Sequence, residues 1–209
     1  MQISITRALS ELKVLQKRFD KEVSQLDVIS VQHGLTLMKN SSVKPEDFSE
    51  KAKAQLQSVE DLQKRIHLIK TKIQQSNAIT VVKIGTQEMT VLEAIIKKSL
   101  IENQKDLLAR LKKQLISAND NFEAATVSNE NKIAKQLEDA TKNSTVKLDL
   151  EVEKQIKASV ESLYPIKMID PCKLSDKIKA LEGEIEEFEA NVDFALSESN
   201  ALTQIEVGD

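Results

Sequence analysis

The sequence has few of the residues that interrupt regular structure, with four glycines and three prolines in 209 residues. It has no tryptophan, one tyrosine and five phenylalanines, so it cannot build an extensive aromatic cluster. Scarce glycine and proline leave few places for turns and favour long, uninterrupted elements. The same scarcity argues against a phosphate-binding loop, and the sequence contains no P-loop, GxGxxG or GxSxG motif.

Residues suited to catalysis, metal binding or redox chemistry are equally few. The single cysteine, Cys172, cannot form an intramolecular disulfide, which indicates a reducing compartment. The two histidines, His33 and His67, have no second ligand at a suitable spacing. We therefore expect no catalytic residue, no metal ligand and no cofactor.

Net charge and hydropathy argue against two further kinds of partner. Thirty Lys and Arg residues nearly balance 33 Asp and Glu residues, which gives a net charge of −3. We therefore expect no nucleic acid as a binding partner. No segment approaches the roughly 20 apolar residues of a membrane span. Met1 to Leu12 lacks the apolar run of a signal peptide, so we expect a cytoplasmic protein without a membrane span.

Apolar residues spaced by three and four predict helices in the first half of the chain. The first helix is expected from about Ser4 to about Val28. For the second helix, Ser42 is the expected N-cap and Pro45 lies in the first turn. This helix should run for about 30 residues and end near residues 76–77.

The helical pattern continues through the second half. Thr90 and Glu93 have capping-box spacing at the start of a third helix, which we expect to end near residues 119–121. A surface-lying fourth helix is expected over 122–143, followed by a break at 143–145. A fifth helix should end at Tyr164-Pro165, because proline disfavours helical geometry in the residue before it.

Three segments have the character of strands or hairpins rather than helices. Residues 28–43, around Gly34, indicate a loop or short hairpin. Residues 79–84 are β-branched and precede Gly85, which predicts a strand. The tail over 202–207 alternates apolar and polar residues and is expected to pair with the strand at 79–84.

The last helix carries the most regular apolar pattern. Asp170 is its expected N-cap and Pro171 lies in its first turn. Five glutamates between 182 and 189 flank the apolar seam, and without histidine on this helix they indicate a solvated face rather than a metal site. The seam predicts a protein interface between copies or, as the alternative, an intramolecular core; its residues are Leu174, Ile178, Leu181, Ile185, Phe188 and Val192.

Three motifs occur in a characteristic order: Leu9-x-x-Leu12 before Lys17-Arg18, residues 61–66 running into 76–78, and residues 89–94. This order resembles the septicolysin-like family of small bacterial helical proteins over about residues 4–115. The remainder, including Tyr164-Pro165, resembles helical proteins of bacteriophages and prophages. The family name implies a cytolysin, and the second resemblance implies a virion or assembly component; neither supplies functional residues.

Together these patterns predict an all-α protein, an elongated antiparallel helical bundle or coiled coil with a small two-stranded β element. We expect a domain at 1–120 and a helical extension at 121–209 or, as the alternative, one continuous domain. The expected function is non-enzymatic, structural or assembly work through helix–helix contacts, as a homo-oligomer or within a larger assembly, in a bacterial host or a virion. The alternative is a membrane-active or pore-forming protein.

Overall fold

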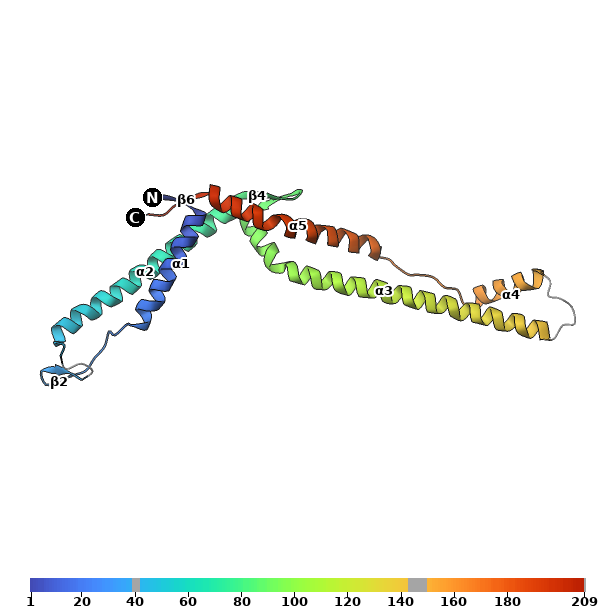
Figure 1. The fold of residues 1–209 in the computed structure, drawn as a ribbon, viewed down its shortest axis with the longest axis horizontal. Helices are drawn as coiled ribbons and strands as arrows, with labels where there is room; N and C mark the ends of the chain where they lie inside the picture. Colours follow the sequence, from blue (N-terminus) through green and yellow to red (C-terminus); the bar gives the residue numbers. More distant parts are fainter. Residues whose placement is uncertain (39–41, 143–149, 209) are drawn as a thin grey trace. The chain divides into compact units, whose positions relative to one another are not determined.

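Helices account for most of the chain in the computed structural model, which describes residues 1–38, 42–142 and 150–208 (Figure 1). This confirms the prediction of a mainly all-α protein. In these residues the elements are, in order, β1 (Gln2–Ser4), α1 (Ile5–Ser24), β2 (Gln32–His33), β3 (Thr36–Leu37), α2 (Pro45–Ile79), β4 (Val81–Ile84), β5 (Gln87–Thr90), α3 (Val91–Lys142), α4 (Leu150–Leu163), α5 (Leu174–Leu202) and β6 (Gln204–Glu206).

The chain divides into two compact units, and α3 and α5 each contribute to both. The first unit comprises Met1–Ser99 together with Glu187–Asp209, and the second comprises Leu100–Glu186. The expected boundary near residue 120 falls within α3, which is continuous there.

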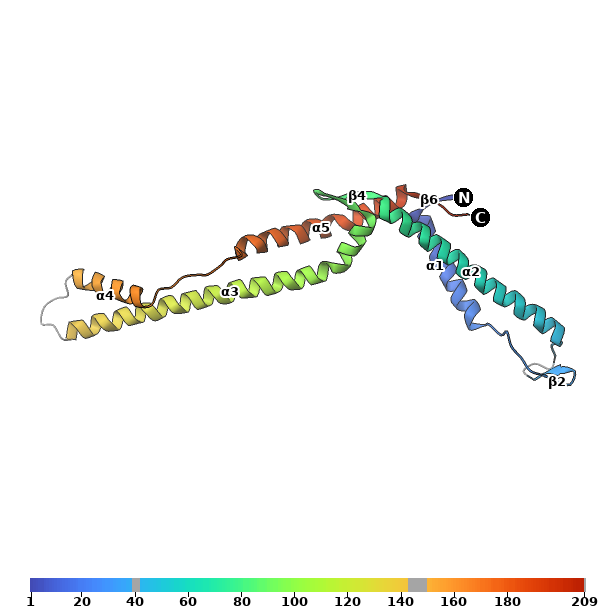
Figure 2. The ribbon, with the colours of Figure 1, turned by 180° about the vertical axis from the view of Figure 1, so that it is seen from behind.

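The core of the first unit lies where the two ends of the chain meet. The strands β1 and β6 form an antiparallel ribbon, with Ile3 opposite Ile205, and both views show the termini side by side (Figures 1 and 2). This ribbon packs on the start of α1 and the second half of α2. The buried cluster consists of Ile3, Ile5, Ala8, Ile69, Ile73, Ile205 and Val207.

The strand pairing predicted for residues 79–84 is wrong. The structure pairs β4 with β5 across the two-residue turn Gly85–Thr86, and β6 with β1. A two-residue hairpin closes a far shorter loop than a pairing between residues 84 and 204, so its entropic cost is lower. The expected strand character of both segments is confirmed, and residues 28–43 contain the expected short hairpin, β2–β3, as far as they are described.

The helix α2 begins and ends differently from the prediction. Ser42 is not its N-cap, because Lys44 occupies that position in extended geometry and makes no side-chain capping bond. A residue before proline is pushed out of helical geometry, so the helix can begin only at Pro45. It continues beyond residues 76–77 to Ile79, because Asn77 is buried on its packed face and Thr80 donates to the Ser76 carbonyl at 2.9 Å.

In the second unit, the prediction that the third helix ends near residues 119–121 is wrong. The helix α3 continues to Lys142 without a break, and it replaces the separate fourth helix expected there. Asparagine and aspartate cost a helix at most about 0.7 kcal/mol each, which packing easily offsets. Ala118 and Ala125 are half-buried and Asn129 is buried, so the packed face continues past this point. The break expected at 143–145 lies outside the described residues.

The two remaining helices follow the prediction more closely. The helix α4 ends at Leu163, before Tyr164-Pro165, as expected. The helix α5 begins later than expected, at Leu174, because Lys173 adopts left-handed geometry with φ of 50°. Asp170 nevertheless caps the turn, since its carboxylate accepts hydrogen bonds from the backbone N–H of Cys172 at 3.2 Å and of Leu174 at 2.8 Å.

Candidate functional site

The apolar seam of α5 is largely covered by the chain itself. Ile178, Ile185, Phe188 and Val192 are buried, whereas Leu174 and Leu181 are half-buried. This burial favours the intramolecular role that was the alternative for the seam. An interface role for these six residues stays a prediction.

Within the first unit, polar contacts hold α5 to the β4–β5 hairpin and to the start of α3. The Glu187 carboxylate accepts a hydrogen bond from the Thr86 backbone N–H at 2.8 Å. It lies so close to Gly85 that a Cβ added to that glycine would clash with it. The Lys97 ammonium lies 4.9 Å from the centre of the Phe188 ring, and Lys98 forms an ion pair with Asp193. Within the first unit, these contacts fix the orientation of α5 from Glu187 onwards relative to the hairpin and to the start of α3.

Within the second unit, α3 is tied to the chain that folds back along it. Lys112 of α3 pairs with Glu182 of α5. The Asn129 amide donates to the Tyr164 carbonyl at 2.8 Å, and the Lys132 ammonium lies 4.5 Å from the centre of the Tyr164 ring. Figure 2 shows α4 lying against the far end of α3.

The second unit buries few apolar side chains for its length. Its buried hydrophobic residues are Ile101, Val160, Ile178 and Ile185. Eleven large apolar side chains described in the same unit are exposed: Leu100, Leu107, Ile116, Phe122, Val127, Leu150, Val152, Leu163, Tyr164, Met168 and Ile169. Among the described residues, this unit therefore exposes more large apolar side chains than it buries.

The first unit has an open groove between α1 and α2, with a volume of about 600 Å³. Leu9 and Leu12 line it from α1 and Ile73 from α2, while His67 and Lys70 lie at its polar edge. Elsewhere on the pair, Arg65 of α2 donates to the Glu11 carboxylate at 3.1 and 3.2 Å, and also to the Gly208 carbonyl. Arg65 therefore ties α1, α2 and the C-terminal segment together.

Electrostatic perturbations in the described residues are local and structural. A hydrogen bond from Arg18 lowers the pKa of the Glu22 carboxyl, and a second hydrogen bond from Ser58 lowers it further. The backbone N–H and the hydroxyl of Thr90 lower the pKa of Glu93 in the same way. The bonds between Thr90 and Glu93 form the predicted capping box at the start of α3.

The residues with potential chemical reactivity are dispersed. His33 is exposed on the β2–β3 hairpin, His67 is exposed at the groove, and Cys172 is exposed before α5. Over the described parts of the chain, no three His, Cys, Asp or Glu side chains are grouped so that they could hold a metal ion. Across the same residues, no helix has both the length and the apolar character needed to cross a membrane.

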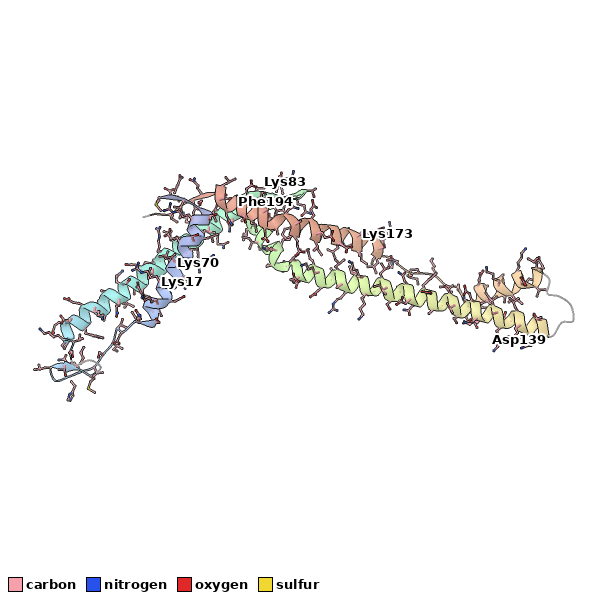
Figure 3. All side chains as sticks on the ribbon, viewed as in Figure 1. Lys17, Lys70, Lys83, Asp139, Lys173 and Phe194 are labelled. Atoms are coloured by element: carbon pink, nitrogen blue, oxygen red, sulfur yellow. The ribbon has the colours of Figure 1, made fainter. Side chains whose placement is uncertain are left out.

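Sequence reasoning missed two features of the surface. Phe194 stands 74% exposed on α5 (Figure 3) and does not belong to the apolar seam. The sequence did contain a signal for Phe194, because a large aromatic residue stands there at a helix position outside the apolar seam. The groove on the α1–α2 pair was not predictable, because it depends on how the two helices pack.

Comparison with protein-family models, with curated proteins and with solved structures yields no match to this chain.

Proposed function

We propose that this chain is a non-enzymatic structural or assembly protein that acts through helix–helix contacts with further copies of itself. The observation that carries this proposal is the exposed apolar surface of the second unit, where four hydrophobic residues are buried and eleven large ones are exposed among the described residues. A unit with so small a core gains little free energy from folding alone. Burial of the exposed side chains between copies supplies the missing apolar contacts.

The total surface area supports the same proposal. The chain exposes 15295 Å² to solvent. By the scaling of surface with mass, two separate globular domains with the lengths of these units would together expose about 11,700 Å². The excess of about 3,600 Å² per chain is more than enough to supply the roughly 1,000–2,500 Å² that each copy buries in an obligate interface.

The test is the solution mass of the wild-type chain by light scattering after size exclusion. We expect a multimer of the 23.4 kDa chain, and a monomer at every concentration would refute the proposal. The double variant Leu100→Ser/Leu107→Ser should shift the equilibrium towards smaller species, since these exposed side chains lie seven residues apart on one face of α3. The matched control is Gln114→Ser/Asn121→Ser, which removes two exposed, uncharged polar side chains with the same spacing on the same helix.

A charged substitution in the buried part of the α5 seam, such as Ile185→Asp, would not test this proposal. The Ile185 side chain is 4% exposed, so a carboxylate there would be placed in the core of the chain. An unpaired buried charge destabilises the fold itself. Loss of the multimer in that variant would not distinguish an interface from misfolding.

A membrane-active function is a second candidate, and the β2–β3 hairpin is the observation that favours it. Ile29, Val31 and Met38 are exposed in and around this hairpin, and Leu35 at its turn is 92% exposed. Exposed aliphatic side chains on a protruding loop can enter the interfacial layer of a bilayer. Dye release from liposomes tests this role: we expect release that is lost in Leu35→Ser if the candidate is correct, and no release from the wild type refutes it.

A further inference from the structure

The groove between α1 and α2 is apolar at its floor and basic around it. Its floor is formed by Leu9, Leu12 and Ile73, with Lys70 at its edge. Lys13 lies four residues after Leu9, on the same face of α1. Figure 3 shows Lys17 of α1 and Lys70 of α2 on these neighbouring helices.

The sequence around this groove contains almost no acidic residue. Between residues 62 and 87 there is no Asp or Glu, and in residues 1–19 the one acidic residue is Glu11. Glu11 is already engaged by Arg65. Neither Lys13 nor Lys70 forms an ion pair with any residue that the structure describes. The groove therefore has an apolar floor and positive charge that the described part of the chain leaves uncompensated.

The C-terminal part of α5 has the complementary chemistry. Residues 180–209 contain nine acidic residues and no Lys or Arg. Phe194 is exposed on this helix, and Glu198 follows it by four residues, which places both side chains on one face. Glu198 is exposed and forms no ion pair with a described residue. An aromatic side chain next to an unpaired carboxylate matches an apolar groove next to unpaired ammonium groups.

The same copy cannot supply this helix face to its own groove. Towards its start in the first unit, α5 is held by Glu187 on the Thr86 N–H. At its other end, the Ile5 N–H donates to the Thr203 carbonyl at 3.0 Å, next to the β1–β6 ribbon. Phe194 lies between these two anchors, remains exposed and is not among the residues that line the groove.

We propose that Phe194 of one copy inserts into the α1–α2 groove of a second copy, with Glu198 of the first copy paired with Lys70 or Lys13 of the second. This inference rests on the proposed function and names one of the surfaces through which the copies assemble. The two patches are different surfaces of one chain, so the contact is head-to-tail. Repetition of such a contact gives a ring if the rotation closes and a filament if it does not.

Complementation between two defective variants tests the contact. Phe194→Ser/Glu198→Lys disables the donor face, and Leu9→Ser/Lys70→Glu disables the groove. These four side chains are exposed to solvent, so folding should persist, and circular dichroism checks it. Each variant alone should associate at least tenfold more weakly than the wild type, as expected for loss of a central aromatic anchor. An equimolar mixture should recover association, because the intact donor face of the groove variant fits the intact groove of the donor variant.

Matched controls separate this contact from general effects of charge or hydrophobicity. Lys53→Glu makes the same charge change on an exposed residue of α2 outside the groove, and Ile79→Ser removes an exposed aliphatic side chain of α2 outside the groove. Each control should leave the association constant unchanged within about twofold.

The outcomes distinguish this inference from the proposed function. If the wild type is a multimer whose mass neither donor nor groove variant changes, the docking of Phe194 is refuted while self-assembly stands. A monomeric wild type overturns both. If the groove variant loses binding to anionic vesicles or to DNA while the multimer persists, the groove serves another partner and the inference is overturned.

Discussion

Gly85→Ala should destabilise the first unit by displacing the carboxylate that holds α5 to the β4–β5 hairpin. Gly85 has φ of +59°, in the left-handed region that residues with a Cβ rarely adopt. A Cβ at this position would also clash with the Glu187 side chain, which would have to move away. Its movement breaks the hydrogen bond from the Thr86 N–H, which is 2.8 Å long.

The expected loss in free energy of unfolding has two parts. The left-handed conformation costs about 1–2 kcal/mol for a residue with a side chain. Loss of an exposed hydrogen bond to a carboxylate adds about 1 kcal/mol. The total of about 2–3 kcal/mol should lower the midpoint of urea unfolding measurably. The Thr86 amide should also exchange its hydrogen faster, because it loses its acceptor.

Two controls separate the backbone cost from the clash. Gly34 has φ of +65° in the β2–β3 hairpin, but nothing lies within 4 Å of where its Cβ would be. Gly34→Ala should therefore cost no more than the backbone part, about 1–2 kcal/mol. In a Glu187→Ala background, Gly85→Ala should also cost only that part, giving a coupling of about 1 kcal/mol. Equal effects of Gly85→Ala and Gly34→Ala, with Thr86 still protected, would refute the reasoning.

Three further predictions concern single side chains. Gly183→Ala should raise the free energy of unfolding by about 0.5–1 kcal/mol, because Gly183 lies in the interior of α5 with open space around it; no gain in the urea midpoint would contradict this. Val160 is fully buried on α4, so Val160→Ala should lower the same quantity by about 2 kcal/mol, and an unchanged midpoint would show that α4 is not packed on α3. The Thr90 bonds hold the pKa of Glu93 below its ordinary value of 4.5, so their stabilisation is complete above pH 4.5 and is lost as the pH falls through the lowered folded-state pKa. Glu93→Gln should remove that part of the acid dependence of urea unfolding, and an identical pH profile would contradict the assignment.

Local sequence rules predicted the elements that depend on a few neighbouring residues. The capping box of Thr90 and Glu93 formed as expected, because both partners lie within one helical turn. The end of α4 before Tyr164-Pro165 followed from the backbone geometry that proline imposes. The predicted end of α3 near residues 119–121 was wrong, because weakly unfavourable residues were overridden by packing that continues to Asn129.

For the candidate site, the sequence identified apolar and charged residues but not their surroundings. The spacing of its apolar residues identified the α5 seam. The burial of Phe188 and Ile185, however, depends on α3 and other elements that lie beside them. The groove of Leu9 and Ile73 joins residues that are far apart in the chain. No local pattern encodes such a pairing.

The sequence by itself determined that this chain is helical, because its low glycine and proline content and its spacing of apolar residues act within single turns of helix. It also determined the charge asymmetry between residues 62–87, which lack acids, and 180–209, which lack bases. The tertiary structure alone decided that β6 pairs with β1 instead of β4. It also decided which apolar residues are buried and which, like Phe194, remain exposed, because burial depends on the elements that pack around a residue and not on its neighbours in sequence.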